Sequence, residues 1–556
     1  MLPYFPRTLL PLAAGACLVS GAALTTTPKP AWAADTVVVV DGGLQLPIAV
    51  ADLETFVQTN QLPPKLQFLA SQLLPGGTDN LQQILKTTLP VPKGQITRLL
   101  NTPTTYILLQ RVGQVIQTGD GRNGAPAIQA ALTKAIDTPE GLNLLNFLRQ
   151  FPSPTIQVNI RQGLTIGQQV TEIITTSIRA LNLVAQVASQ EVATSPPVAN
   201  LPPLTGGKTP WQKSSLSVTD TSRQRTFNTD LYLPTTPPPT PPPLVVISYG
   251  LGEDLTSFAY LAQFLASQGF AVAIPENPES NADYFSKVLA GAAPDPINPQ
   301  TLVNRPLDIR ALLDELGRRV TSDPALRGRL NPQQVAAIGH SLGGYTVLAL
   351  AGAPISQGPE VRQVCDPVLQ GDILNISYLL QCRVLALTNP PTNFRDPRIK
   401  AVIATNPVGS VVFGPAGFGQ IQVPTLLLGS TEDFAAPVLS EQIRPFTWLN
   451  TPPRYLTILE NGTHFSVMGG SGSGVINLPS AALGPDRRIG QEYLRVLSLA
   501  FVQTHVNNQP KFQPYLSAAY AQVLSKPAMP LRLIQNLTPD QLNQALTTPV
   551  TATAQP

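Results

Sequence analysis

The amino-acid sequence predicts an α/β fold, a mostly parallel sheet with helices on both faces, preceded by a mainly helical N-terminal domain. From residue 244 onward, short apolar runs alternate with segments of helical periodicity, which is typical of a parallel sheet. One of these runs, 335–338, leads into a glycine-rich turn and then into another apolar, helical segment. Residues 52–193 instead show helical periodicity that is broken by turn clusters.

The N-terminal domain is expected over residues 34–200. It begins with a predicted hairpin over 35–50, in which two strand-like runs flank Asp41-Gly42-Gly43. This region contains no histidine, no cysteine and no paired carboxylates, so we interpret it as a structural domain packed on its neighbour. Its helices are expected near residues 52–59, 79–88, 104–117, 125–136, 139–150 and 164–192.

A second domain is expected over residues 201–505, after a proline- and glycine-rich boundary. Strands are predicted over 214–219 and 225–233, and the proline-rich segment 234–243 is expected to be a stiff connector that cannot pair in a sheet. The strands of the parallel sheet are expected at 244–248, 270–274, 335–338, 399–404, 425–428 and 455–459.

The helices of this domain are expected over 257–268, 307–320 and 488–505. Pro306 is expected at the first turn of the second helix, where a missing N–H costs nothing. Residues 355–398 interrupt the alternation and are predicted to form an inserted cap. Residues 506–556 are expected to form a C-terminal helical extension.

The residues Gly339-His340-Ser341-Leu342-Gly343 match the G-x-S-x-G nucleophile elbow. Any side chain at Gly339 or Gly343 would collide with the neighbouring strand or helix. The turn holds Ser341 in a strained conformation, beside the first free N–H groups of a helix. Because these groups stabilise negative charge, we predict that Ser341 is a catalytic nucleophile.

A serine hydroxyl needs a base within hydrogen-bond reach, and histidine fits this role near neutral pH. The chain has three histidines. His340 lies within the elbow, with its side chain expected to point away from the serine hydroxyl, and His505 is expected on the surface at a helix end. His464 follows the last parallel strand, at the sheet edge where reacting groups collect. We predict that His464 is the base.

A carboxylate should fix the tautomer of this histidine. Asp433 follows the strand 425–428 and is the predicted acid, with Glu432 beside it as the competitor. The order Ser341, Asp433, His464 is the order of the α/β-hydrolase arrangement.

The oxyanion that forms during acyl transfer needs two N–H donors. The backbone N–H of Leu342, directly after the nucleophile, is the first expected donor. The second is expected from the turn 248–252, which follows the first parallel strand, and Leu251 is the predicted donor there.

Four motifs carry a resemblance to a known group of enzymes: Gly250-Leu251-Gly252, Arg305-Pro306-Leu307-Asp308-Ile309, Gly339-His340-Ser341-Leu342-Gly343-Gly344 and Gly462-Thr463-His464-Phe465. Through them the segment from about Lys208 to His505 resembles serine α/β-hydrolases of the platelet-activating-factor acetylhydrolase, polyesterase and predicted dienelactone hydrolase group. The whole mature chain is similar to exported α/β-hydrolases of photosynthetic bacteria that carry an N-terminal helical domain of unassigned function.

Three positions depart from that group. Tyr249-Gly250 replaces the usual His-Gly before the oxyanion turn. The acetylhydrolases take their acid after the preceding strand, where this chain has Asn406, so the resemblance to the polyesterases implies Asp433. Dienelactone hydrolases use cysteine where this chain has Ser341, so their substrate does not carry over.

The first 33 residues resemble an export signal, with Arg7, an apolar segment over 9–23 and the cleavage motif Ala31-Trp32-Ala33. A permanent membrane anchor and lipoprotein processing at Cys17 are the alternatives. Export would leave Cys365 and Cys382, an even number that predicts one disulfide, with two buried free thiols as the alternative.

Charged residues make up 12% of the chain, about half the usual share, and removing residues 1–33 would lower the net charge from +3 to +1. This low and nearly balanced charge indicates that the chain is neither a disordered polyelectrolyte nor a nucleic-acid-binding protein. Three scattered histidines and the absence of a C-x-x-C motif give no metal ligand set, and no cofactor is expected.

The sequence therefore predicts an exported serine hydrolase of carboxylic esters, most simply of lipid or other apolar acyl esters. An acyltransferase would use the same residues, and a non-catalytic binding protein on a hydrolase scaffold is the rival from another class. Weak lipid association through the N-terminal domain is a further hypothesis.

Overall fold

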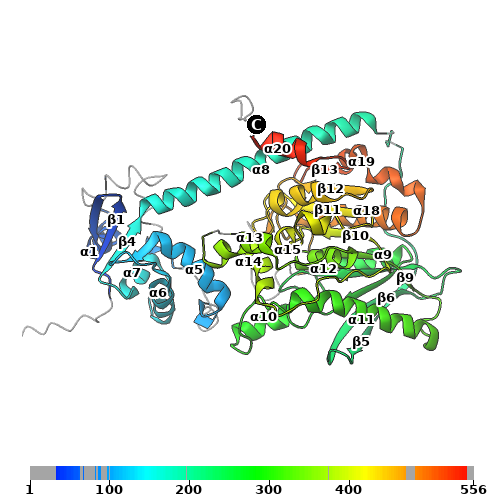
Figure 1. Ribbon diagram of the computed structural model, residues 1–556, viewed down its shortest axis with the longest axis horizontal. Helices are drawn as coiled ribbons and strands as arrows, with labels where there is room; N and C mark the ends of the chain where they lie inside the picture. The colour runs from blue at the N-terminus through cyan, green and yellow to red at the C-terminus, as the bar shows by residue number, and fades with distance from the viewer. Residues whose placement is uncertain are drawn as a thin grey trace, which may run out of the picture.

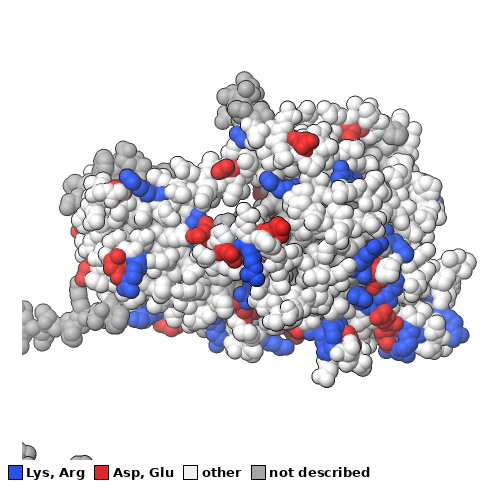
Figure 2. All heavy atoms as spheres, viewed as in Figure 1, with Lys and Arg blue, Asp and Glu red and all other residues white. Residues whose placement is uncertain are grey.

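The described chain forms a small N-terminal unit and a large sheet domain, joined by one long helix (Figure 1). On the face drawn in Figure 2, charged side chains are sparse and both signs occur across it. The computed structural model describes residues 33–62, 67, 82, 85–88, 97, 98, 100–195, 197, 198, 200–372, 375–470 and 483–547.

The small unit has its own hydrophobic core and its own four-stranded sheet, in the order β2-β1-β4-β3. The hairpin of β1 and β2 was predicted. Strand β3 was missed because its three residues overlap the end of the helix predicted over 104–117, and the five-residue alternation of β4 was not recognised as a strand. The strands are β1 (Thr36–Asp41), β2 (Leu44–Ala49), β3 (Ile116–Thr118) and β4 (Thr155–Asn159). The helices that cover them are α1 (Val50–Thr59), α5 (Pro103–Val115), α6 (Ala125–Asp137) and α7 (Leu144–Gln150).

The start of α7 differs from the prediction, which placed it at residue 139. The helix begins at Leu144, because the side chain of Asn143 accepts a hydrogen bond from the N–H of Asn146 and caps the first turn. Gly141 has a φ of 68°, which no helix allows. Half of the helix predicted over 79–88 lies outside the described residues.

Helix α8 (Ile160–Thr194) leaves the small unit and ends on the large sheet domain (Figure 1). Its C-terminal half packs into the core of that domain through Ala180, Val184 and Val187. The predicted boundary at residue 200 is therefore wrong, because one uninterrupted helix belongs to both units.

The large sheet has nine strands in the order β13-β12-β11-β10-β9-β7-β8-β6-β5. The run from β8 to β12 is parallel, and the strands at either end pair antiparallel. Its strands are β5 (Trp211–Asp220), β6 (Arg225–Pro234), β7 (Pro243–Ser248), β8 (Ala271–Pro275), β9 (Asn331–His340), β10 (Ile399–Thr405), β11 (Thr425–Ser430), β12 (Arg454–Leu459) and β13 (Leu531–Ile534).

Helices cover both faces of this sheet and enclose two hydrophobic clusters. Members of one cluster come from α11 (Thr301–Ser322), α12 (Leu342–Ala351), α15 (Ser410–Phe418) and α16 (Arg444–Trp448). Members of the other come from α9 (Ala259–Ser267), α18 (Arg487–His505) and α19 (Ala518–Leu524). A mostly parallel sheet that is covered in this way, with a tight turn after β9, is the α/β-hydrolase fold.

The predicted cap follows α12. It contains α13 (Pro359–Leu369), α14 (Ile376–Cys382) and the short helix η1 (Arg383–Ala386). The buried side chains of Cys365 and Cys382 form a disulfide that ties α13 to α14. Two covalently linked helices thus build the insertion.

Two expectations about prolines were wrong. Pro306 lies inside α11 rather than in its first turn, and the carbonyl of Leu302, which has lost its helical donor, accepts a hydrogen bond from the Tyr345 hydroxyl at 2.7 Å. Pro234 and Pro243, at the ends of the predicted connector, are the last residue of β6 and the first of β7. Both are strand ends, where a missing donor is tolerated.

The C-terminal extension is not only helical. Strand β13 pairs antiparallel with β12, so the sheet domain extends past the predicted limit at residue 505. Four residues beside Pro530 were too short a run to identify as a strand from the sequence. The last described helix, α20 (Pro539–Thr547), packs on α8 and α16.

Within the described part of the chain, no helix has both the length and the apolar character needed to cross a bilayer. The predicted export signal and Cys17 lie outside the described residues.

Candidate active site

Ser341 occupies the tight turn between β9 and α12. Its backbone has φ 55° and ψ −119°, a strained conformation for a residue with a side chain. Its N–H donates to the carbonyl of Thr405 on β10 at 2.9 Å, and its carbonyl accepts from Tyr345 one helical turn later. Both neighbouring elements therefore hold this strained residue in place.

The glycines of the elbow have the predicted steric role. A Cβ atom added at Gly339 would overlap the carbonyl of Gly343, and one added at Gly343 would overlap the carbonyl of Ser248. The turn thus brings β7, β9 and α12 closer together than any side chain would allow.

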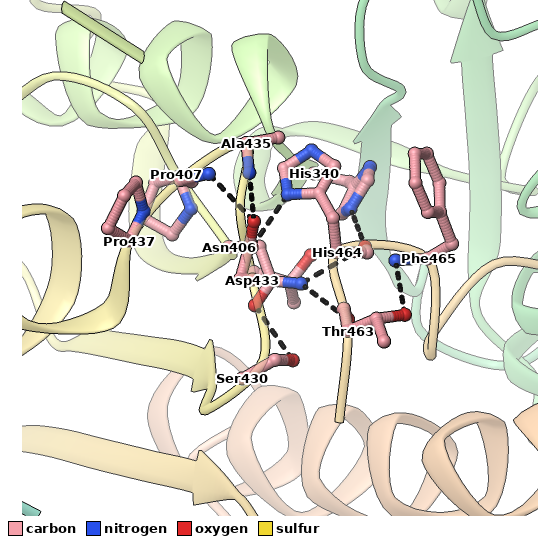
Figure 3. Close-up of polar contacts among 12 residues, drawn as sticks. His340, Asn406, Pro407, Ser430, Asp433, Ala435, Pro437, Thr463, His464 and Phe465 are labelled. Carbon is pink, nitrogen blue, oxygen red and sulfur yellow. Dashed lines mark hydrogen bonds and ion pairs between the residues drawn. The ribbon is translucent and has the colours of Figure 1, made fainter. Parts of the chain in front are cut away.

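His464 and Asp433 meet at the carboxyl ends of β12 and β11. The Nδ1 atom of His464 lies 2.7 Å from Oδ2 of Asp433, and both side chains are buried (Figure 3). The other oxygen of Asp433 accepts the N–H groups of Ala435 and Ala436 at 2.8 and 2.7 Å. The side chain of Glu432, the competing acid, is exposed.

His464 also lies beside the elbow, because its ring centroid is 4.8 Å from that of His340. Among the described residues, however, the Ser341 hydroxyl makes no hydrogen bond to His464. The structure therefore pairs the predicted acid with the predicted base and places the base beside the elbow, but it shows no hydrogen bond between that base and the serine hydroxyl.

The turn after β7 lies against the serine. A Cβ atom on Gly250 would be 3.0 Å from the Cβ of Ser341. The N–H of Gly250 donates to Glu253 and that of Gly252 to the carbonyl of Ser280. Of the residues Gly250, Leu251 and Gly252, Leu251 is thus the one whose N–H has no acceptor in the described part of the chain.

Arg305 holds this turn from behind. Its guanidinium is buried and donates to the carbonyls of Tyr249 and Gly250 and to the Ser280 hydroxyl. Because a peptide unit is planar and trans, the fixed Gly250 carbonyl directs the Leu251 N–H to the opposite side, away from Arg305. Burial lowers the pKa of Arg305 to about 10, so the group stays charged at neutral pH.

Leu342 begins α12, directly after Ser341. N–H groups in the first turn of a helix have no acceptor within the helix. The two predicted oxyanion donors, Leu251 and Leu342, therefore lie on the two segments that flank the serine.

Asn406, where the acetylhydrolase group has its acid, links loops instead. Its side-chain amide donates to the carbonyls of Thr463 and His464, and its oxygen accepts from the Ser430 hydroxyl (Figure 3). The backbone of His464 is therefore held by the residue that follows β10, and its side chain by the loop after β11.

The rings of Phe465 and Phe434 lie between His464 and solvent. The ring of Phe465 lies edge-on to that of His464 at 5.4 Å, and Phe434, on the loop of Asp433, lies 6.3 Å from Phe465. Phe434 is 52% exposed, although large apolar side chains are usually covered. We refer to Phe434 and Phe465 as the aromatic ledge.

Sequence reasoning missed the ledge and also Glu253, the buried partner of the elbow residue His340. It placed His505 on the surface, but this histidine is partly buried, contacts Phe501 and hydrogen-bonds to the Tyr455 hydroxyl at 3.1 Å. Burial lowers the pKa of His505 to about 4. Among the described residues, no group of three or more His, Cys, Asp or Glu side chains could hold a metal ion.

The profile of a family described as "Alpha/beta hydrolase of unknown function (DUF1400)" matches residues 33–159. The match covers the small unit and ends at the residue before α8 begins. No curated protein matches the chain. The match thus relates the chain to α/β-hydrolases through the small unit, whereas Ser341, Asp433 and His464 lie on the large sheet.

Proposed function

We propose that this chain is an exported serine hydrolase that cleaves carboxylic esters through an acyl-enzyme. One observation carries the proposal: a buried His464–Asp433 pair with a 2.7 Å contact lies beside an elbow serine with a φ of 55°. Buried imidazole–carboxylate pairs next to a strained serine are the arrangement that activates a hydroxyl for acyl transfer.

In the proposed mechanism, the Ser341 oxygen attacks the ester carbonyl while Nε2 of His464 takes its proton. Asp433 holds Nδ1–H of His464, which keeps Nε2 free to accept. The N–H groups of Leu251 and Leu342 stabilise the oxyanion, and His464 then protonates the leaving alcohol. Water repeats the sequence on the acyl-enzyme and releases the acid.

The aromatic ledge supports a preference for apolar acyl groups or alcohols. The exposed ring of Phe434 packs near Phe465, which contacts the base His464. It therefore offers an apolar surface on the side from which substrate would approach. We expect esters with longer acyl chains to gain contact with Phe434, at about 25 cal/mol for each Å² of apolar surface removed from water.

Export and weak lipid association belong to the same proposal. The Cys365–Cys382 disulfide supports an oxidising compartment.

Exposed apolar side chains on α8 support contact with lipid. They belong to Leu164, Val170, Ile173, Ile174 and Ile178. Flotation of the full chain with neutral liposomes tests this contact, and a chain that does not float would contradict it.

Hydrolysis of a p-nitrophenyl ester series from acetate to decanoate tests the activity. Wild type should hydrolyse the esters and S341A should not. F434A should lower kcat/KM for decanoate by about tenfold, which corresponds to about 1.4 kcal/mol, and should leave acetate nearly unchanged. V523A is the matched control, because Val523 is 61% exposed on α19. A folded wild type without turnover would favour the non-catalytic binding protein.

A further inference from the structure

A second buried acid–histidine pair lies directly behind the proposed triad. Oε1 of Glu253 is 2.6 Å from Nδ1 of His340, and the two residues are 5% and 1% exposed. Neither takes part in the mechanism given above. Burying two ionisable groups costs free energy unless their contacts compensate for lost water, so each of their hydrogen bonds is informative.

The contacts of His340 determine where its protons lie. Its Nε2 atom is 2.9 Å from the backbone carbonyl of His464, which can only accept, so Nε2 carries a hydrogen. The contact between Nδ1 and Glu253 then needs one more proton. A carboxylate accepts the Gly250 N–H, at 2.9 Å, more strongly than a neutral acid does, and this favours placing the extra proton on His340.

The electrostatics agree with this inventory. Burial on its own would lower the pKa of His340, but the charge and the hydrogen bond of Glu253, with the carbonyl of His464, raise the pKa above its usual value. Around the ring lie Phe258 at 5.5 Å, His464 at 4.8 Å and, further off, the charge of Asp433.

Through these contacts the pair connects three parts of the site. Glu253 holds the N–H of Gly250 in the oxyanion turn, His340 belongs to the nucleophile elbow, and the ring of His340 holds the backbone of His464. These segments are far apart in sequence: 87 residues separate Glu253 from His340 and 124 separate His340 from His464.

We propose that Glu253 and His340 are positioning residues, which fix the oxyanion turn and the catalytic histidine relative to each other through a buried hydrogen-bonded chain. The proposal rests on the proposed hydrolase function. Arg305 holds the Tyr249 and Gly250 carbonyls on one side of the turn, and Glu253 holds the Gly250 N–H on the other. Catalysis is sensitive to such placement, since an error of about 1 Å can lower the rate roughly 100-fold.

The test compares E253A with E253Q. In E253Q, the side-chain amide can accept the Gly250 N–H and donate to Nδ1 of a neutral His340, so this variant keeps all three hydrogen bonds while E253A removes two. We expect E253A to lower kcat by about 10- to 100-fold with KM within about threefold. We expect E253Q to retain kcat within about threefold of wild type.

D396A controls for stability alone. Asp396 is buried and paired with Arg398 just before β10, at the opposite end of the strand from the site. It should lower the Tm without lowering kcat. Wild-type kcat in E253A, or a loss in E253Q equal to that in E253A, would overturn the positioning role.

A second readout does not depend on turnover. The chain has three histidines, so histidine-selective ¹⁵N labelling gives a spectrum that H340Q assigns. We expect a doubly protonated His340 ring in wild type at pH 7 and a neutral ring with hydrogen on Nε2 in E253Q. A neutral His340 in wild type would contradict the assignment of hydrogens to both ring nitrogens. An inactive wild type with a charged His340 would instead count against the hydrolase function alone.

Discussion

At the scale of single residues, Asp433 accepts three hydrogen bonds, one from His464 and two from backbone N–H groups of its own loop. This loop aims the carboxylate before any substrate binds. Local turn geometry thus orients the carboxylate, and the carboxylate in turn orients the imidazole of His464, 31 positions away in the chain.

Replacing Asp433 by asparagine tests this orientation. In D433N the amide oxygen can still accept from Ala435 and Ala436, which leaves the NH₂ group facing His464. His464 would then carry its hydrogen on Nε2 and could not act as a base. We expect kcat to fall on the order of 10⁴-fold with little change in Tm. Activity within about tenfold of wild type would contradict the assignment of the acid.

His505 predicts a pH dependence of stability. Its folded pKa of about 4 lies below the usual value of 6.5, so the unfolded chain binds more protons between these two values. The contribution of His505 to stability should be lost as the pH falls from about 6.5 to 4. In H505Q, the decrease in Tm over this interval should be smaller than in wild type. Parallel Tm curves for the two proteins would refute this prediction.

At the scale of elements, Pro306 and Tyr345 form a compensating pair. The proline removes the helical donor for the Leu302 carbonyl, and the buried Tyr345 hydroxyl replaces it. This contact joins α11 to α12 directly behind the elbow.

A double-mutant cycle measures the compensation. Y345F should lower the free energy of unfolding by about 1–2 kcal/mol, because a buried carbonyl loses its donor. In the P306A background, the new backbone N–H of residue 306 can donate to the Leu302 carbonyl. The substitution Y345F should therefore lower the free energy of unfolding less than it does in wild type, with a coupling energy of about 1 kcal/mol between the two sites. Urea unfolding gives the values. Equal costs in both backgrounds would show that the hydroxyl is not the substitute donor.

The Cys365–Cys382 disulfide also links two elements, α13 and α14. Its closed loop spans 17 positions, for which chain entropy predicts a stabilisation of about 3 kcal/mol. C365A/C382A should therefore lower the free energy of unfolding by about that amount. Wild type that is denatured without reductant should not react with iodoacetamide at either cysteine. Modification there would show that the thiols are free.

The sequence predicted most elements of the sheet because buried parallel strands are unbroken apolar runs, such as Val335–Ile338. It also predicted the elbow, because Gly339 and Gly343 have a steric reason to be glycine. It could not predict β13 or the role of Glu253. Their contacts join residues far apart in the chain, and neither carries a local pattern.

At the scale of the whole molecule, side-chain hydrogen bonds hold the small unit against the sheet domain, among them one from Arg98 to the carbonyl of Leu289. Asp295 accepts the N–H and the hydroxyl of Thr104 at the start of α5, and Gln114 donates to Asp372 after α13. At the other end of α8, Glu191 accepts the N–H groups of Gln535 and Asn536. The small unit and the C-terminal end of the long helix are therefore each hydrogen-bonded to the sheet domain.

T104V should loosen this docking. Valine removes the hydroxyl bond to Asp295 while keeping the shape, at a cost of about 1 kcal/mol, so the docked state should open about five times more often. Limited proteolysis within residues 34–200 should accelerate accordingly. T55V is the control, because the Thr55 hydroxyl bonds only within α1. Equal cleavage rates for wild type and T104V would show that this contact does not hold the units together.

Whether Ser341 is an activated nucleophile can be tested by labelling the purified full chain with a fluorophosphonate and locating the adduct by peptide mass spectrometry. We expect one adduct, on Ser341 in wild type, and its loss in H464A while that variant remains folded. An unlabelled folded wild type, or an adduct on any other residue, would contradict the claim that Ser341 is an activated nucleophile.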